Sequence, residues 1–397
     1  MTGSVSSGAA CSLKKISREI FRKILDSVQT GRKQYARISS AHLSGISYLN
    51  IGDPGLEFLE DLSNSGLRFK VKTTINPGCI DFDSAVECDP GIVEKQRRIV
   101  ESLRAMGAVV SLTCTPYLFD NPVKRNQRVS WAESSAVLYA NSLIGASTNK
   151  EGSLTALASA ILGYTARTGV HLRTGKNPHI LVEYEGELKD ELDYGLLGYV
   201  MGLKAGSKIP YLRLRNNYAG SLSNYKQLLA SFGTSGTAPI VWIEKVTPGF
   251  SKVRKPRKKM VVDKHELEDQ RKALSEEIPP SPEEKLVFVT GCPHLSLEEA
   301  ENILTALGSV RGLSVEAWAF VSRRAYLEAI KKGLWTSLSE KGVRVFKDSC
   351  VMYCKLKKEK AYVVTNSVKA AYYLRGNFRL KTVLKSLKEV VEEYGVK

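Results

Sequence analysis

An alternation of strand-like and helix-like segments is the feature that most restricts how this chain can fold. Residues 68–78, RFKVKTTINPG, alternate like a strand and then reach an Asn-Pro-Gly turn. Residues 90–107, PGIVEKQRRIVESLRAMG, carry a proline near the start and a glycine at the end, as a helix does. A short strand is predicted over 108–114, AVVSLTC. This order of elements predicts an α/β layered fold.

The length of the chain predicts more than one core, because 397 residues exceed what one ordinary hydrophobic core covers. We expect three lobes: an N-terminal α/β lobe over 1–185, a middle lobe with a basic connector over 186–282, and a C-terminal α/β lobe over 283–397. The charged, proline-flanked stretch 251–285 is interpreted as a surface linker or an extended connection between lobes.

The net charge of +17 raises the question of nucleic acid. Part of the charge is local, in the run SKVRKPRKK at 251–259, and no nucleic-acid-binding motif is visible. We therefore expect no nucleic-acid partner, and a solvated basic surface that steers an anionic substrate or an acidic partner subunit. No stretch approaches the roughly 20 apolar residues that span a bilayer, and the N-terminus lacks the apolar core of a signal peptide. We expect a cytoplasmic protein without membrane contact.

Three cysteines share an unusual context. Cys114, Cys292 and Cys350 each follow a β-rich run, and ligands of α/β sheets bind beyond the carboxyl ends of strands. The three thiols are thus candidates for one common centre, although their spacing is far from the compact motifs of ferredoxins or zinc ribbons. Dispersed cysteines are more often small buried hydrophobes, without a disulfide framework in a reducing compartment. We assign four to that class: Cys11, Cys79, Cys88 and Cys354.

Three thiolates that meet would leave room for chemistry. A [4Fe-4S] cluster with three cysteine ligands keeps one iron open, and that iron acts as a Lewis acid on a hydroxyl and a carboxylate, as elimination of water requires. Three thiolates also suit the zinc of a hydrolase. A third class is a basic RNA-binding α/β protein with merely buried cysteines.

Several long motifs resemble a known family. They are AESSAVLYANSLIGASTNKEG, LTCTPY, GVHL, VTGCPHLS, DSCV, SSAHLSG (39–45), TTINPGCIDFD (73–83) and NSVKAAYY (366–373). Together they resemble the large, catalytic subunit of aconitase X, over nearly the whole chain. The resemblance implies multi-lobed, aconitase-like layered α/β domains around a central cluster cleft. It also implies a hydro-lyase with a [4Fe-4S] cluster held by Cys114, Cys292 and Cys350.

The resemblance also implies a partner. Members of the aconitase superfamily close a swivel domain over the cluster, and this chain lacks the residues for one after Lys397. We expect a heterodimer with a separate small swivel subunit, which would supply the serine that acts as catalytic base.

Two substrates are compatible with the resemblance. Split archaeal forms dehydrate (R)-5-phosphomevalonate to trans-anhydromevalonate 5-phosphate in the mevalonate pathway of isoprenoid biosynthesis, whereas fused bacterial forms act on hydroxyprolines. The split architecture and the basic charge favour the phosphorylated hydroxy acid, and hydroxyproline or another hydroxy acid is the alternative.

Other residues are expected around such a site. The loop of Gly45, Ile46 and Ser47 and the turn of Asn76 and Pro77 offer donors to a substrate, with ordinary turn chemistry as the alternative.

Glu133, Ser134 and Ser135 open a predicted helix, where they would bind an anion or merely cap the helix. We give Glu133 and Ser134 catalytic roles as well. Lys369 resembles the basic residue of the family site, with a solvated lysine as the alternative.

Three further polar residues are weaker candidates. His171 is predicted to be catalytic and His294 to donate to substrate or tune the cluster, although a lone histidine is more often structural. Asn149 is a candidate of the same kind.

Overall fold

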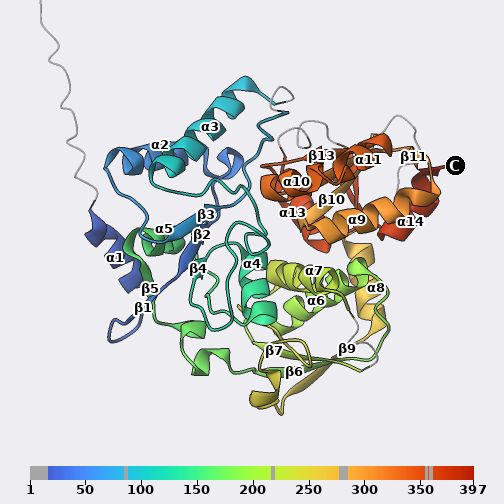
Figure 1. Cartoon of the computed structure of the whole chain (residues 1–397). Helices are drawn as coiled ribbons and strands as arrows, with labels where there is room; N and C mark the ends of the chain where they lie inside the picture. Colours follow the sequence, from blue (N-terminus) through green and yellow to red (C-terminus); the bar gives the residue numbers. More distant parts are fainter. Residues whose placement is uncertain (1–16, 85–87, 216–219, 277–284, 354–355, 357–360) are drawn as a thin grey trace, which may run out of the picture.

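The computed structural model describes residues 17–84, 88–215, 220–276, 285–353, 356 and 361–397. Figure 1 shows three α/β bodies that follow one another along the chain, from blue through green to orange and red. Each body is built on its own parallel sheet. Mixed α/β architecture with parallel sheets is therefore confirmed.

The first body contains a three-stranded parallel sheet of order β3-β2-β4. Its strands are β2 (Ser40–Leu43), β3 (Lys72–Ile75) and β4 (Ser130–Trp131). Its helices are α1 (Arg18–Ser27), α2 (Tyr48–Asn64), α3 (Pro90–Ala105), α4 (Ser134–Tyr139), the π-helical η2 (Ala140–Ile144) and α5 (Ser153–Leu162). A two-stranded antiparallel sheet of β1 (Tyr35–Arg37) and β5 (Tyr164–Ala166) completes it.

The second body has a four-stranded parallel sheet of order β8-β7-β6-β9. Its elements are η3 (Gly169–His171), η4 (Thr174–Lys176), β6 (Ile180–Tyr184), α6 (Glu191–Ala205), β7 (Pro210–Leu214), α7 (Leu222–Ser235), β8 (Trp242–Ile243), η5 (Phe250–Lys252), β9 (Lys259–Val262) and α8 (Lys264–Ala273). Helices α6 and α7 pack very closely, because a Cβ atom at Gly198 would lie 2.0 Å from the Leu228 carbonyl oxygen.

The third body has a five-stranded parallel sheet of order β13-β12-β10-β14-β15. Its strands are β10 (Leu286–Leu295), β12 (Glu316–Val321), β13 (Val343–Phe346), β14 (Tyr362–Thr365) and β15 (Thr382–Leu384), with β11 (Gly312–Leu313) and β16 (Gly395–Val396) paired apart. Its helices are α9 (Leu297–Ala306), η6 (Leu307–Ser309), α10 (Arg323–Ile330), α11 (Leu334–Glu340), α13 (Val368–Phe378) and α14 (Leu387–Tyr394).

Local sequence explains where two of the helices begin. Asp89 precedes α3, and its carboxylate accepts hydrogen bonds from the backbone N–H groups of Gly91 and Ile92. Ser296 precedes α9 and forms a capping box with Glu299. Such caps satisfy backbone donors that the first helical turn leaves free. The helix predicted over 90–107 is confirmed as α3.

Two predictions of local structure are wrong. Residues 108–114 are not a strand: this segment runs beside β3 but pairs with it only through a bridge between Thr74 and Val109. The basic stretch 251–285 is not an extended connector, because η5, β9 and α8 lie within it and β9 pairs with β6. Lysines at an exposed edge strand mask a strand signal, since edges commonly carry them. Residues 277–284 lie outside the described residues.

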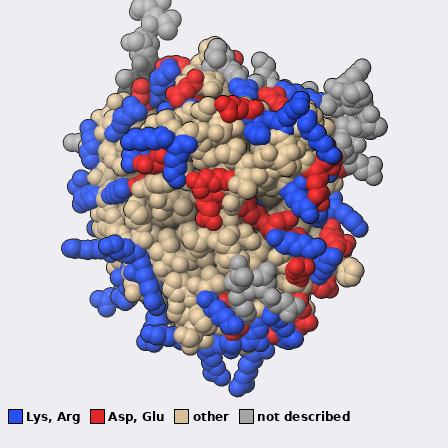
Figure 2. All heavy atoms as spheres, turned by 45° about the vertical axis from the view of Figure 1, so that its right-hand side comes forward, with Lys and Arg blue, Asp and Glu red and all other residues tan. Residues whose placement is uncertain are grey.

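The surface charge is spread widely on the face drawn in Figure 2. Lysine and arginine side chains cover much of this face, and acidic side chains gather near its middle and right. No single basic stripe of the kind that follows a nucleic-acid backbone is visible there. Among the described residues, no helix combines the length and apolar character needed to cross a membrane.

Candidate active site

Loops from the first and third bodies meet around one hollow of about 290 Å³. The first body contributes the residues that directly follow β2, β3 and β4, and the third contributes residues of β10, residues that follow β13, and one face of α13. The backbone N–H of Gly78 donates to the Asp348 carbonyl at 2.8 Å and joins the two bodies here. Two parallel sheets thus deliver their carboxyl ends to one place, where α/β proteins bind ligands.

All three predicted cysteines line this hollow. Cys114 follows the extended segment beside β3, Cys292 lies in β10 where the pairing register shifts, and Cys350 follows β13. Burial raises the pKa of the Cys114 thiol to about 12 and also raises the pKa of Cys292. Burial raises the pKa of Cys350 too, and so would negative charge on Cys292 and Cys114. The thiols are close enough to repel one another as thiolates, so deprotonating all three calls for a cation between them.

His294 connects the segments that carry the three cysteines. Its imidazole lies 3.2 Å from the Thr113 hydroxyl and 2.7 Å from the Ser349 carbonyl oxygen, and its backbone N–H donates to Cys114 Sγ at 3.3 Å. Burial lowers the pKa of His294 to about 4, so the ring is neutral, with Nε2–H donating to the carbonyl. One fully buried ring therefore fixes the residues next to Cys114 and Cys350, from a position two residues after Cys292.

A buried ion pair forms another part of the wall. Lys369 Nζ lies 2.7 Å from Glu133 Oε1 and 3.1 Å from Ser135 Oγ, with both charged side chains about one-tenth exposed. Burial would raise the pKa of Glu133, but the charge of Lys369 and hydrogen bonds from Lys369, Asn76 and Ser135 hold it at about 2. Glu133 is thus a carboxylate that caps α4 through the Ser135 N–H.

A chain of hydrogen bonds continues behind this pair. Asn76 Nδ2 donates to Glu133 Oε2 at 2.9 Å, and the Asn76 carbonyl oxygen lies 3.0 Å from His42 Nε2. His42 Nδ1 accepts from the Thr74 hydroxyl at 2.8 Å, and that hydroxyl in turn accepts from Asn121 Nδ2. Burial lowers the pKa of His42 to about 4, so Nε2 carries the proton that Asn76 accepts. The network fixes which way the Asn76 amide points.

Sequence reasoning missed several residues of the site. His42 lies in β2 within an alternating run, where nothing in the sequence separates it from a core residue. Tyr373 and Asn377 line the hollow four and eight residues after Lys369 on α13. The i, i+4 spacing that places them on one face of a helix is the signal that was available.

Most of the other predicted residues line the hollow or lie directly behind its wall. Gly45, Ile46, Ser47, Pro77 and Ser134 line the hollow, and Ser135 lies behind the Glu133–Lys369 pair. Gly45 has a left-handed backbone conformation (φ 70°), and a Cβ atom there would lie 2.8 Å from Ser153 Oγ.

Two predicted residues do not reach the hollow. His171 lines a different hollow, next to Arg128 and Lys176. Asn149 holds the turn before His171, because its side chain accepts from Val170 N–H at 3.0 Å and donates to the Thr168 carbonyl at 3.3 Å. His171, which was predicted to be catalytic, therefore does not line the hollow that contains the three cysteines.

The remaining described cysteines do not line the hollow. Cys79 is a fully buried thiol whose Sγ lies 3.3 Å from the Gln96 side-chain oxygen. Cys88 is disulfide-bonded, so its assignment as a packed thiol is wrong. A disulfide depends on the approach of two Cα atoms in space, which dispersed spacing does not reveal. Cys11 and Cys354 lie outside the described residues.

The spacing of the possible ligand side chains indicates what kind of metal group fits the hollow. In the described part of the chain, no three Cys, His, Asp or Glu side chains lie close enough together to hold one metal ion. The ligands of a single zinc all lie within about 2.3 Å of it. The thiols instead stand around a hollow of about 290 Å³, which leaves space for a group larger than one ion.

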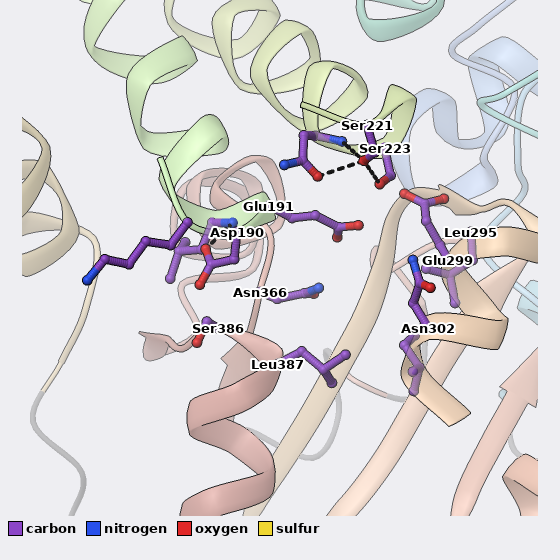
Figure 3. A pocket seen from close by; sticks show the side chains of 14 residues that line it. Asp190, Glu191, Ser221, Ser223, Leu295, Glu299, Asn302, Asn366, Ser386 and Leu387 are labelled. Atoms are coloured by element: carbon purple, nitrogen blue, oxygen red, sulfur yellow. Dashed lines mark hydrogen bonds between the residues drawn. The ribbon is translucent and has the colours of Figure 1, made fainter. Parts of the chain in front are cut away.

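A second hollow lies where the second and third bodies meet (Figure 3). It has a volume of about 230 Å³ and is lined by the partly buried Glu191 and the buried Glu299. Burial and the charge of Glu299 raise the pKa of Glu191 to about 7. Lys226 pairs with Glu299 and also donates to the His294 carbonyl at 3.0 Å. Lys226 therefore links Glu299 in this hollow to the backbone of β10, two residues after Cys292.

The combination of fold and hollow agrees with comparison to known proteins. Residues 7–174 match the aconitase X first domain, residues 178–272 the second domain and residues 286–395 the third domain. The chain belongs to the aconitase X family, whose members are dehydratases, that is, hydro-lyases.

Individual relatives narrow the comparison. The phosphomevalonate dehydratase large subunit of Thermococcus kodakarensis is 33% identical over 369 residues, which cover 91% of each chain. The cis-3-hydroxy-L-proline dehydratase of Pseudomonas aeruginosa is 30% identical over 87% of this chain and 61% of that protein. A crystal structure of Thermococcus kodakaraensis aconitase X in its holo-form superposes with a TM-score of 0.85 at 30% identity, over 95% of this chain and 94% of that one.

These relatives imply two further components. The holo-form of the solved relative implies a cofactor for the family. The name "large subunit" implies a small partner subunit. Both agree with the expectations from sequence at this coarser level.

Proposed function

We propose that this chain is the large subunit of a dehydratase that converts (R)-5-phosphomevalonate to trans-anhydromevalonate 5-phosphate. The observation that carries the proposal is the meeting of Cys114, Cys292 and Cys350 with the Glu133–Lys369 pair in one hollow. Similarity to phosphomevalonate dehydratase large subunits supports the substrate. The reaction removes a proton α to the carboxylate and a hydroxide from the neighbouring tertiary carbon, forming a carbon–carbon double bond and water.

We infer that the three cysteines hold a [4Fe-4S] cluster. The thiols surround a space larger than one ion requires, and their mutual repulsion as thiolates would be relieved by a cationic group. When bound, such a cluster supplies an open iron that polarises the substrate hydroxyl and accepts the departing hydroxide. The same spread of donors argues against a zinc hydrolase, because zinc draws its ligands around one point.

Lys369 and Asn76 are proposed to orient the substrate carboxylate. Lys369 brings a positive charge to the wall of the hollow, and the Asn76 amide is held by Glu133 on one side and His42 on the other. Donors fixed before the substrate arrives need no reorganisation during the reaction. The backbone N–H groups of the loop at Gly45, Ile46 and Ser47 border the same space and are proposed to bind the remaining oxygen atoms.

The catalytic base is proposed to come from the small subunit. Within the hollow, Glu133 is already paired with Lys369 and its pKa is held at about 2, so it is a weak proton acceptor near neutral pH. We accordingly assign Glu133 and Ser134 to positioning and substrate contact. The small subunit is proposed to supply cations for the phosphate too, since Lys369 is the one Lys or Arg side chain among the described residues that line the hollow.

The second candidate substrate is a hydroxyproline, which the relative from Pseudomonas aeruginosa favours. The two can be separated by assaying the purified heterodimer, without oxygen, on 5-phosphomevalonate and on cis-3-hydroxy-L-proline. A dehydrated product from 5-phosphomevalonate alone supports the proposal. Turnover of hydroxyproline alone would keep the reaction class and replace the substrate. The cluster assignment is tested separately by replacing Cys114, Cys292 or Cys350 with serine. Cys79→Ser is the matched control for these variants, because Cys79 is buried outside the hollow.

A further inference from the structure

A third hollow, of about 660 Å³, lies where the first and second bodies meet. Three segments that are distant in sequence build it: the loop before β4, the two short helices η3 and η4, and the turn that contains η5. None of the residues of the cysteine hollow lines it. Clefts between bodies of a chain are common binding sites for small molecules.

The charge of this hollow is of one sign. Its described lining contains no Asp or Glu, and no carboxylate of the described chain forms an ion pair with any of its cations. The cationic residues are Arg125, Arg128, Arg173, Lys176, Lys252 and Arg254. A concave surface with charges of one sign concentrates counter-ions and ligands of the opposite sign.

Arg125 is exposed and lies close to two glycines that border the hollow. A Cβ atom at Gly145 would lie 3.2 Å from Arg125 Cγ, and a Cβ atom at Gly249 would lie 3.2 Å from Arg125 Nη2. Both glycines have left-handed backbone conformations (φ 79° and φ 86°). The absence of side chains at these glycines leaves room for the guanidinium, whose donors are available for a bidentate contact with an oxyanion.

Repulsion among the cations supports the same reading. Burial lowers the pKa of Lys176, and the neighbouring charge of Arg128 lowers it further. Burial likewise lowers the pKa of His171 to about 4, again helped by Arg128 and Lys176. Like charges brought together without a counter-charge are costly, and sites that bind charged ligands commonly show this pattern.

His171 adds an independent observation. Its side chain is 4% exposed and lines the hollow, and neither ring nitrogen has a hydrogen-bond partner among the described residues. Buried polar groups are nearly always hydrogen-bonded, because an unpaired one costs about 1–3 kcal/mol. The sequence GVHL drew attention to this residue, yet the cysteine hollow leaves it unused.

We propose that this basic hollow binds a small molecule that carries a phosphate or diphosphate group, at a site separate from the cysteine hollow. Arg125, Arg128 and Lys176 would bind the phosphate oxygens, and Trp242 would contact the remainder of the ligand. The segment from Glu133 to Gly145 connects the two hollows, since Glu133 caps α4 in one and Gly145 ends η2 in the other.

Titration calorimetry of the full chain with tripolyphosphate at low ionic strength tests the proposal. The part of the tryptophan emission that is lost in Trp242→Phe gives a local readout, because the Trp242 ring N–H donates to the Lys176 carbonyl at 2.7 Å at the edge of the hollow. We expect saturable binding and an emission change. Arg128→Ala should weaken binding about tenfold or more, since a charged hydrogen bond is lost, and Arg128→Lys should restore part of it. Arg104→Ala is the matched control, an exposed arginine on α3 far from the hollow.

Three outcomes would overturn the proposal. The first is the absence of saturable binding, and the second is an equal loss in Arg104→Ala and Arg128→Ala, which would mean unspecific charge attraction. The third is equal affinity for citrate, or displacement of tripolyphosphate by a single-stranded oligonucleotide that binds more tightly. In that case the hollow would recognise carboxylates or nucleic acid instead of a small phosphorylated molecule.

Discussion

The cysteine hollow and the basic hollow treat charge in opposite ways. In the first, the charge of Lys369 is matched by Glu133, and a chain of hydrogen bonds through Asn76, His42 and Thr74 continues behind the pair. In the second, cations stand together without a carboxylate. A balanced wall suits chemistry that needs fixed dipoles, whereas an unbalanced wall suits the capture of an anion. The difference indicates that the two hollows have different tasks.

Removing one of the three proposed cysteine ligands should have the largest effect, and it should be confined to the cysteine hollow. Cys114→Ser, Cys292→Ser and Cys350→Ser should each lose bound iron, and activity should fall by about a thousandfold, because a Lewis acid contributes several kcal/mol. Iron content and turnover of the heterodimer measure this. Cys79→Ser should keep both, and full iron in all three ligand variants would contradict the assignment.

Loss of the Glu133–Lys369 ion pair should have the next largest effect. Lys369→Met leaves Glu133 buried and unpaired and should cost about 3–5 kcal/mol of unfolding free energy. Glu133→Gln combined with Lys369→Met should recover much of that stability in urea unfolding but not the activity. If the double variant is fully active, the pair is only structural.

His294 tests how firmly the three cysteine segments are held together. His294→Ala should lower retention of iron by roughly 10–100-fold, as is usual when a group behind the ligands is lost. His294→Asn should retain one of the two ring contacts and fall between. Iron dissociation into a chelator is the readout, and an unfolding midpoint of the iron-free chain separates a positioning effect from general destabilisation. Unchanged iron dissociation in His294→Ala would refute the role.

The smallest effect concerns pH. Because the pKa of Glu133 is lowered from 4.5 to about 2 in the folded chain, the folded state binds fewer protons than the unfolded state in this range. The stabilisation is therefore fully present above pH 4.5 and is lost as the pH falls through 2. The difference in unfolding free energy between the native chain and Glu133→Gln should shrink over this window. A constant difference would show that Glu133 does not titrate as described.

Sequence predicts elements whose signals are local. Ser296 followed by Glu299 is a complete cap, and the α3 segment carries its own start and stop, so both helices follow from a few residues. The three cysteines could be grouped because each follows a β-rich run, although they come from two separate sheets whose carboxyl ends face one hollow.

The remaining features depend on what lies opposite in space. His42 acts through Asn76, 34 residues away, and His294 through Thr113 and Ser349, at separations that no local pattern reveals. His171 shows the converse case, because its motif resembles the family but its side chain lines the basic hollow and not the cysteine hollow.

Iron and sulfide analysis of the full chain, purified with its small subunit without oxygen, tests the central claim most directly. The account predicts about four irons and four sulfides per chain, with a brown absorption spectrum, since a [4Fe-4S] cluster on three thiolates has that composition. It also predicts loss of this spectrum in Cys114→Ser, Cys292→Ser and Cys350→Ser. A colourless protein that binds one zinc, or that takes up no iron on reconstitution, would contradict it.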